Sequence, residues 1–557
     1  MHITGTPQRP AEAAAAADAG RPLPGRGRAV LRRCLAALGV LAAVALLFVA
    51  YLQVSRTSPE NSDEANDLLM AWDMLHGNVL LHGWWLSDVS FWTTELPQYA
   101  LLERLFGLHA ATAHIAAAMT YTLVVVVAVL LARGKVPSAG QAASAGQAVG
   151  RERLARTLLT GGILLAPQLG VGVFVVLLSL GHIGTAVPLM LTWLVIDRMR
   201  ARWHVPVLVG LLLAWALLAD QLVLLTGVIP LAAVCAMRAA QAAHADRPWR
   251  YEACLAAAAL AAAGAAWGIA GLLRASGGFM LHAVPYHVAP PGSWTGHAWV
   301  TGQGLLAMLG AKPQGPAAAL AFAVLHMAGV ALLAWAVATV ARRFLSWPDR
   351  VSQVLLAAIV LNVAAYVPGT LANASPRNAR EFAMVLPFGA VLAGRTLAPR
   401  VTGAWERRRQ RGRAGWTGPA LLAVLAGYAA SLGYAAAQPS AAPANAQLAQ
   451  FLAAHHLTYG VSGYWQASIV TVGSDGAVTV RAVQPTLQPD PWESESSWYD
   501  SGTHRATFLV TEDKPGFLSY WMPDPAALAA YGRPARTYHV GPYTILVWDK
   551  NLLAATG

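Results

Sequence analysis

The chain has 557 residues, of which 56% are hydrophobic (AVILMFWYC) and only 12% are charged, and its mean hydropathy is +0.47. Ordinary soluble proteins carry about 25% charged residues, so this composition excludes a soluble, collagen-like or disordered protein and indicates a chain that lies mostly in lipid. The cysteines Cys34, Cys235 and Cys254 lie in or beside apolar runs without metal-binding spacing, which also excludes a disulfide scaffold.

The apolar runs predict a polytopic α-helical membrane protein. Runs close to the length needed to cross a bilayer lie at 31–51, 110–132, 157–179, 253–273, 317–340 and 418–436. Shorter or interrupted runs at 182–197, 205–219, 221–237, 351–367 and 382–398 bring the prediction to about eleven spans. Residues 30–436 are therefore predicted to form a transmembrane domain.

The basic residues predict the orientation. With the N-terminus in the cytoplasm, most of the 39 Lys and Arg residues fall on the cytoplasmic side, as the positive-inside rule requires. The net charge of +12 then follows from topology and does not indicate nucleic-acid binding. Residues 1–29 are predicted to be a disordered cytoplasmic tail, followed by an uncleaved signal anchor, and 134–150 a low-complexity cytoplasmic linker.

The first outside loop, 52–109, is too long for a simple connector and is rich in acidic residues. Its run NSDEANDLLMAWDMLHGN predicts a helix capped by Asn61 or Ser62, which places Asp63 and Asp67 on one face. Either these acids are solvated and favour the helix dipole, or one of them accepts a proton from an acceptor hydroxyl at the membrane surface.

Further along the chain the polar signals are weaker. His182 is interpreted as a structural residue at the membrane interface, and Asp220 either ends two short helices or binds substrate. The outside loop 274–316 is aromatic and either stacks on a sugar or forms an interfacial belt. Its histidines, which match no strong metal motif, are His282, His287 and His297.

The segment ANASPRNAREFAMVLPFGAVLAGR, at 372–395, predicts a helix start on the outside, with Ser375 as N-cap and Pro376 in the first turn. Arg377 and Arg380 would share a face there. They either bind a phosphate together with the helix N-terminus, or pair with Glu381 or lipid headgroups.

Residues 437–557 are predicted to form a small extracytoplasmic α/β domain, because strand-like runs appear in SIVTVGSDGAVTVRAV, THRATFLVT and YTILVWD. Its tryptophans either hold a glycan acceptor or form an ordinary core. They are Trp465, Trp492, Trp498, Trp521 and Trp548.

This order of features resembles the GT-C superfamily of membrane glycosyltransferases, such as the protein O-mannosyltransferases and lipid A aminoarabinose transferases. The resemblance covers the topology, an Asp-Glu pair soon after the first span, the long helical first loop, a late Arg motif and a soluble C-terminal domain. It implies that Asp63, in SDEANDLLMAWDMLHGN, is the catalytic base. Glu64 follows it as in the family.

The resemblance also implies secondary acidic candidates, which are Glu64, Asp67 and Glu95, the last in TTELPQYALL. Arg377 and Arg380 stand where the family contacts the lipid-linked phosphate. Two departures are clear: Ala65 and Asn66 replace the family's Tyr or Phe, and the second outside loop, SLGHIGTAVP, has no DxD or ExD motif. No metal ligand is assigned, and dependence on a divalent metal is left open.

The leading interpretation is an integral membrane glycosyltransferase of a bacterial cell envelope, with a polyprenyl-phosphate sugar donor. The acceptor would be a glycan, lipid or protein outside the plasma membrane. The rivals are a transporter or flippase, which would have ionisable residues near mid-membrane, and a non-catalytic cell-envelope scaffold.

Overall fold

The computed structural model describes residues 26–135, 139–165, 169–178, 182–282, 284, 286–373, 375–411, 417–512 and 524–555. The chain separates into two compact units, Met1–Val49 and Ala50–Gly557. The described part of the first unit is the first part of helix α2 (Arg26–Ser55). Residues 1–25 of the predicted disordered tail lie outside the described residues.

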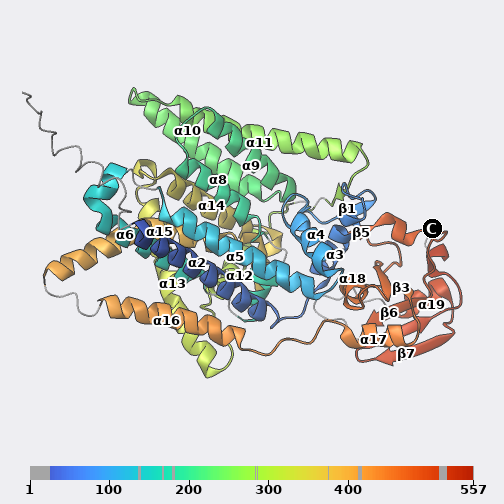
Figure 1. The fold of residues 1–557 in the computed structure, drawn as a ribbon. Coiled ribbons are helices and arrows are strands. Elements are labelled where there is room, and N and C mark those ends of the chain that lie inside the picture. Colours follow the sequence, from blue (N-terminus) through green and yellow to red (C-terminus); the bar gives the residue numbers. More distant parts are fainter. Residues whose placement is uncertain are drawn as a thin grey trace, which may run out of the picture. The chain divides into compact units, whose positions relative to one another are not determined.

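The protein is a mostly helical membrane protein (Figure 1). Five of the described helical stretches are long and apolar enough to cross a membrane: Val30–Ser55, Ala111–Arg133, Leu224–His244, Arg250–Ala275 and Ala317–Ala341. A sixth is the bent pair Pro376–Phe382 and Val385–Arg408, whose two parts meet at 60°. Shorter apolar helices are His204–Ala219, Arg350–Tyr366 and Leu422–Ala436. The total of about eleven spans remains a prediction.

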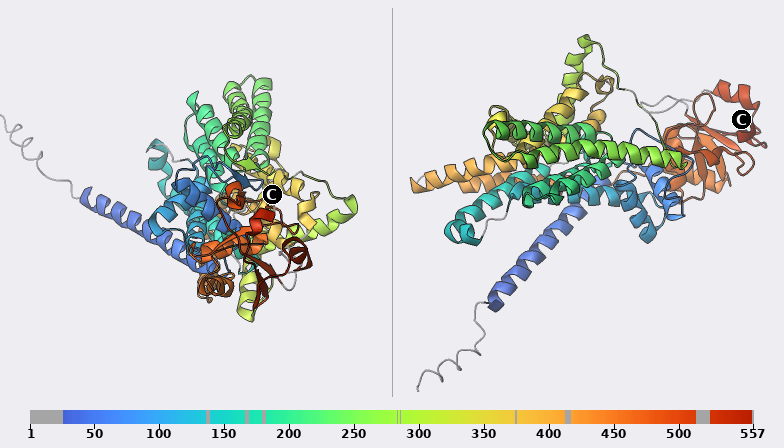
Figure 2. Two further views of the ribbon diagram at one scale, coloured as in Figure 1. Left: turned by 90° about the vertical axis from the view of Figure 1, so that its right-hand side faces the viewer. Right: turned by 90° about the horizontal axis from the view of Figure 1, so that it is seen from above.

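Most helices between residues 111 and 436 lie in the apolar runs of the sequence. In chain order the helices of this region are α5 (Ala111–Arg133), α6 (Ala139–Leu164), α7 (Val171–Val173), α8 (Ala186–Arg198), α9 (His204–Ala219), α10 (Ile229–His244), α11 (Arg250–Ala275), α12 (Trp294–Met308), α13 (Ala317–Ala341), α14 (Arg350–Tyr366), α15 (Val385–Gln410) and α16 (Thr417–Ala436). Helices α9, α10 and α11 lie side by side (Figure 1, Figure 2).

Two predictions for residues 134–179 were wrong. The expected span 157–179 is not one helix, because α6 ends at Leu164 and α7 starts after Gly170, whose φ of 73° is a left-handed conformation that glycine adopts without strain. The stretch from Ala139 belongs to α6 although we interpreted 134–150 as a linker. Alanine is the strongest helix former, and this stretch is rich in it.

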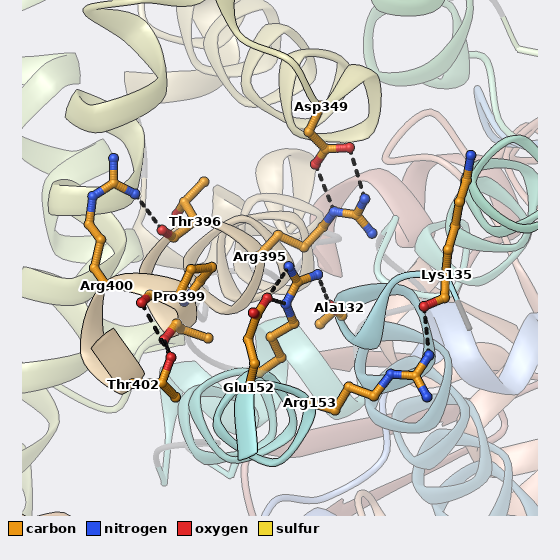
Figure 3. Close-up of polar contacts among 12 residues, drawn as sticks. Ala132, Lys135, Glu152, Arg153, Asp349, Arg395, Thr396, Pro399, Arg400 and Thr402 are labelled. Carbon is orange, nitrogen blue, oxygen red and sulfur yellow. Dashed lines mark hydrogen bonds and ion pairs between the residues drawn. The ribbon is translucent and has the colours of Figure 1, made fainter. Parts of the chain in front are cut away.

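One buried ion cluster joins the membrane helices. Arg395, on α15, donates to Asp349 at 2.8 Å and to Asp197 at 2.8 Å, and its side chain is only 7% exposed. Figure 3 shows Arg395 facing Asp349 in a region where Lys135, Arg153 and Arg400 also lie. A buried arginine needs such carboxylate partners because an unpaired charge in a membrane protein is costly.

The segment 52–109, which the sequence predicts to be the first outside loop, is structured, as predicted. It contains α3 (Ser62–Leu75), β1 (Trp84–Leu86) and α4 (Glu95–Phe106), and α3 packs against α4. Leu68, Trp84 and Leu96 are each no more than 1% exposed and belong to one hydrophobic cluster. This core holds α3 in a fixed position.

A small three-stranded sheet ties three distant segments together. Strand β1 pairs in parallel with β2 (Met280–Leu281) and antiparallel with β5 (Ser494–Glu495). The C-terminal segment is thereby fixed next to the segment 52–109. Helix α18 (Tyr464–Gly473) also packs against α3 (Figure 1).

The C-terminal segment forms a five-stranded mixed sheet in the order β4-β3-β6-β8-β7. The strands are β3 (Tyr459–Ser462), β4 (Thr479–Ala482), β6 (Phe508–Glu512), β7 (Arg536–Val540) and β8 (Tyr543–Val547), and the helices are α17 (Ala446–Ala454), α18 and α19 (Asp524–Tyr531). Strand β3 runs parallel to β4 and β6, whereas β8 is antiparallel to β6 and β7.

The strands predicted in THRATFLVT and YTILVWD are confirmed as β6 and β8. The prediction for SIVTVGSDGAVTVRAV was half wrong, since its first half lies in α18 and only its second half forms a strand, β4. The β-branched residues of this helix are buried between the sheet and α3, so tertiary packing overrides their strand propensity.

Candidate active site

Helix α3 begins with a capping box. The side chain of Asn61 accepts hydrogen bonds from the backbone N–H groups of Asp63 at 2.9 Å and Glu64 at 3.4 Å, and the Glu64 carboxylate accepts from the Asn61 N–H at 2.7 Å. This confirms the predicted helix and its cap. Glu64 is 1% exposed, and burial raises the pKa of its carboxyl group. This secondary candidate serves the helix cap and does not line the acidic pocket described next.

A polar pocket of about 240 Å³ opens beside α3; we call it the acidic pocket. Its walls come from the first loop, from His182, from the turn that precedes α15, and from the C-terminal segment. The lining residues are Asp63, Asp67, Ser87, Asp88, Val89, Phe91, His182, Arg380, Glu381, Tyr464, Trp465, Asp490, Trp492 and Glu493. Carboxylates and tryptophans in one pocket suit a sugar, whose hydroxyls donate hydrogen bonds and whose ring faces are apolar.

Asp63 is held by two partners. Arg380 Nη1 donates to Asp63 Oδ2 at 3.1 Å, and the Tyr464 hydroxyl donates to Asp63 Oδ1 at 2.7 Å. The side chain of Asp63 is 16% exposed and lines the acidic pocket, so an occupant of the pocket can reach it. An oriented carboxylate of this kind suits a general base.

Asp67 lies one turn further along α3 and also lines the acidic pocket. It is 3% exposed, and burial, together with the charges of Glu493 and Asp63, raises its pKa well above the ordinary value for aspartate. A raised pKa favours the neutral form of this carboxyl group. It suits hydrogen bonding to a substrate better than proton abstraction.

Arg380 begins a chain of charged contacts that leads away from Asp63. Arg380 Nε lies 3.4 Å from Glu381 Oε1, and Glu381 Oε2 lies 2.9 Å from His182 Nε2. His182 Nδ1 lies 2.7 Å from Asp220 Oδ2. Because both ring nitrogens of His182 face carboxylate oxygens, both must donate, and His182 is an imidazolium.

His182 and Asp220 therefore belong to the site, and the structural interpretation of His182 from sequence was incomplete. Asp220 does end α9 as expected, and its side chain accepts from the Leu222 N–H at 2.8 Å. It is fully buried, and Thr185 also donates to it at 2.8 Å. The predicted pairing of Glu381 with an arginine is confirmed.

The two arginines predicted to bind phosphate, Arg377 and Arg380, have different contacts in the structure. Ser375 caps the 3₁₀ turn Pro376–Phe382 as predicted, accepting from the Arg377 N–H at 3.2 Å. Arg380 points to Asp63, but the guanidinium of Arg377 stacks over the ring of Phe174 at 5.2 Å and is not part of the acidic pocket lining.

Glu95, the other secondary candidate, also lies apart from Asp63. It is 5% exposed, accepts a short hydrogen bond from Thr94, and lines a cavity of about 20 Å³ together with Glu64. Burial raises the pKa of Glu95 to about 7. A cavity of this size has room for a water molecule but not for a sugar.

A second, larger cavity of about 1010 Å³ adjoins the acidic pocket; we call it the apolar cavity. The two share Asp88, Val89, His182 and Glu381 as a common wall. Most other lining residues are apolar, among them Leu222, Leu224, Leu225, Trp267, Ala270, Phe279, Leu281, Val284 and Leu371. Arg274, at the end of α11, also lines it and makes no ion pair with any described residue.

The loop histidines do not form a metal site. His282 and His287 line the apolar cavity, whereas His297 is buried in α12 and bonds to the Val367 carbonyl at 3.0 Å. Across all the residues that the structure describes, no group of three or more His, Cys, Asp or Glu side chains is placed to hold a metal ion.

The predicted tryptophans differ in their surroundings. Trp465 and Trp492 line the acidic pocket and also pack against a core cluster of the C-terminal segment, whereas Trp548 is buried in a second core cluster and Trp498 packs against Trp84. Trp521 lies outside the described residues. Sequence reasoning missed Tyr464 and Glu493, although an acid flanked by tryptophans in PWESESSW is a local signal of a polar site.

The fold and this site define a polytopic membrane protein with a polar pocket beside a large apolar cavity. ArnT from Cupriavidus metallidurans, whose structure was solved bound to undecaprenyl phosphate, is similar with a TM-score of 0.50 and 12% identity, over 91% of this chain and 97% of that chain. This likeness shows a shared fold, which agrees with the resemblance predicted from sequence.

Two other solved structures are similar at lower scores. The Archaeoglobus fulgidus oligosaccharyltransferase has a TM-score of 0.44 and 12% identity, over 84% of this chain and 67% of that chain. The mycobacterial arabinofuranosyltransferase AftD has a TM-score of 0.42 and 14% identity, over 92% of this chain and 40% of that chain. No protein-family model and no curated protein matches the sequence.

Proposed function

We propose that the protein is a membrane glycosyltransferase that moves a sugar from a polyprenyl-phosphate donor to an acceptor hydroxyl outside the membrane. The observation that supports this most is the shared wall between the acidic pocket and the apolar cavity. A lipid-linked sugar has the same two halves, an apolar chain and a polar sugar, joined by a phosphate. ArnT, which has this fold, was solved with undecaprenyl phosphate.

In this proposal the polyprenyl chain lies in the apolar cavity and the sugar in the acidic pocket. The phosphate then lies near their common wall, where Arg380 and the imidazolium of His182 are the nearby cations of the acidic pocket. Arg380 already neutralises Asp63 and Glu381. Arg274, from the apolar cavity, is therefore proposed as a phosphate ligand together with Arg380. The predicted ligand Arg377 lies over Phe174 and would have to turn toward the pocket to join them.

Asp63 is proposed as the base. The acceptor oxygen attacks the anomeric carbon of the sugar, the bond between that carbon and the phosphate oxygen breaks, and its electron pair leaves with the phosphate. The acceptor proton passes to Asp63, and nearby cations stabilise the charge that develops on the leaving phosphate. Asp67 and Asp88 line the same pocket and would bind sugar hydroxyls.

The proposal includes the predicted topology. It has about eleven spans within residues 30–436, a cytoplasmic N-terminus, and an extracytoplasmic domain at 437–557. The two ends of this region differ in a way that supports the arrangement. Arg380, just before α15, lines the acidic pocket, whereas Arg395, within α15, lies in the basic region that Figure 3 shows. Basic residues gather on the cytoplasmic side of membrane proteins. The predicted localisation in a bacterial plasma membrane and the acceptor class (glycan, lipid or protein) belong to the same proposal.

Native mass spectrometry of the detergent-purified protein tests the donor without assuming a sugar. We expect a co-purified polyprenyl phosphate or its glycosylated form, which is lost in the Arg274→Ala and Arg380→Ala double variant. The proposal is abandoned in favour of a transporter or scaffold if added polyprenyl-phosphate sugars never bind and only bulk phospholipid appears.

A further inference from the structure

The hydroxyl of Tyr464 lies between two carboxyl groups. It is 2.7 Å from Asp63 Oδ1 and makes a short contact with Glu493 Oε2. Tyr464 is 3% exposed and stands at the start of α18, which packs against α3. The contact therefore joins the C-terminal segment to the proposed catalytic base.

A phenol has one proton to donate, so Tyr464 cannot donate to both carboxyl groups at once. If both were ionised, one of the two contacts would bring together oxygens that have no proton between them. The geometry therefore requires one additional proton on Asp63 or on Glu493.

The surroundings place that proton on Glu493. Asp63 is paired with the guanidinium of Arg380, whereas Glu493 is 9% exposed and makes no ion pair with any described cation. The groups that face Glu493 are the acids Asp63 and Asp67 of α3, the hydroxyl of Tyr464 on α18, the more distant charge of Arg380, and the neutral side chains of Asn66 and Ser87. Two acids and one remote cation favour the neutral form of Glu493.

We propose that Glu493 is a neutral acid that donates to the oxygen of Tyr464 and so fixes Tyr464 as a donor to Asp63. Tyr464 and Glu493 are then positioning residues for the base, supplied by the C-terminal segment. The inference rests on the proposed function in one respect, namely that Asp63 is the base of a transfer reaction.

The arrangement has a pH limit. Burial, together with the charge of Asp63, raises the pKa of Glu493 to about 8. Above that pH Glu493 becomes a carboxylate beside Asp63, and Tyr464 has two anions competing for its single proton. The base then loses its fixed orientation, so activity falls on the alkaline side.

Glu493→Gln and Glu493→Ala separate positioning from packing. Glutamine keeps an N–H that donates to Tyr464 and cannot ionise, whereas alanine removes the donor. We expect kcat of Glu493→Ala to fall on the order of 100-fold, Glu493→Gln to retain at least tenfold more activity than Glu493→Ala, and Glu493→Gln to lose the alkaline fall near pH 8. Equal loss in both variants, or an unchanged alkaline limb in Glu493→Gln, would overturn the proposal.

A second measurement does not depend on activity. Infrared difference spectra between pH 7 and pH 9 are recorded on the purified protein with Glu103→Gln, because burial raises the pKa of Glu103 to about 9 as well. They should show loss of a protonated-carboxyl band, and the added Glu493→Gln should remove that change. Asp490→Asn is the control, because Asp490 lines the same pocket but does not contact Tyr464. An unaltered spectrum in Glu493→Gln contradicts the inference, whereas absent transferase activity in the wild type contradicts only the proposed function.

Discussion

Arg380 donates to Asp63 across 3.1 Å, although the two residues are 317 positions apart in the chain. From sequence these residues were assigned separate roles, a phosphate ligand and a base. Their contact couples the roles, because the cation that would stabilise a leaving phosphate also neutralises the group that accepts the proton. A donor phosphate that attracts Arg380 would weaken its hold on Asp63 and leave a carboxylate oxygen free for the acceptor hydroxyl.

Replacement of Asp63 by Asn removes the proposed base while keeping the size of the side chain. We expect the transfer rate to fall by about 10² to 10⁴, because this is the usual contribution of a positioned base. The measurement is transfer of a labelled sugar from a polyprenyl phosphate in detergent or vesicles. Asp475→Asn, at a side chain that is 65% exposed, is the matched control and should retain full activity. A fully active Asp63→Asn protein would show that Asp63 is not the base.

Replacement of Arg274 by Ala tests the phosphate position. We expect the binding free energy for polyprenyl phosphate to weaken by about 1.5 to 3 kcal/mol, which is the contribution of a charge-assisted hydrogen bond. Arg377→Ala and Arg380→Ala are compared with it in the same binding assay, and the exposed Arg104 provides the control variant Arg104→Ala. If Arg377→Ala alone weakens binding, the phosphate lies at the turn before α15 and not near the apolar cavity.

Local features of the site were predictable from sequence. The capping box of α3 and the Ser375 cap each depend on residues within four positions of one another, and short polar motifs of this kind specify a helix start. The long outside loop was also recognisable as structured from its length and polar pattern.

The assembly of the site was not predictable in the same way. The contacts of Asp63 with Arg380 and Tyr464, and the place of His182 between two carboxylates, depend on how distant segments pack. A single sequence carries no direct signal for such contacts. The helix at Tyr464–Gly473 shows the same effect, since its β-branched residues favour a strand until burial against the sheet and α3 is taken into account.

Replacement of His182 by Ala leaves Asp220 and Glu381 without their shared cation. The His182 side chain is 8% exposed and that of Asp220 is fully buried, so the loss should destabilise the protein by about 3 to 5 kcal/mol, as when one partner of a buried ion pair is removed. Thermal unfolding in detergent measures the Tm, with the exposed His244→Ala as control. An unchanged Tm would show that the two carboxylates carry no buried charge.

Glu103 should make the stability of the protein depend on pH. Its side chain is 2% exposed, and neither carboxyl oxygen has a hydrogen-bond partner among the described residues. Burial raises the pKa of Glu103 to about 9, from an ordinary value near 4.5. The folded state therefore binds a proton that the unfolded state has lost, and the free energy of unfolding falls as pH rises from about 4.5 to about 9.

Replacement of Glu103 by Gln keeps the shape of the side chain and removes this proton uptake. We expect the variant to be more stable than the wild type at pH 7, by up to about 3 kcal/mol, and equally stable near pH 4. Thermal unfolding measured from pH 4 to pH 9 should give a flatter profile for Glu103→Gln, whereas Asp549→Asn, at an exposed carboxylate, should follow the wild type. Parallel profiles for Glu103→Gln and the wild type would mean that Glu103 is already ionised at pH 7 and reaches solvent or a cation.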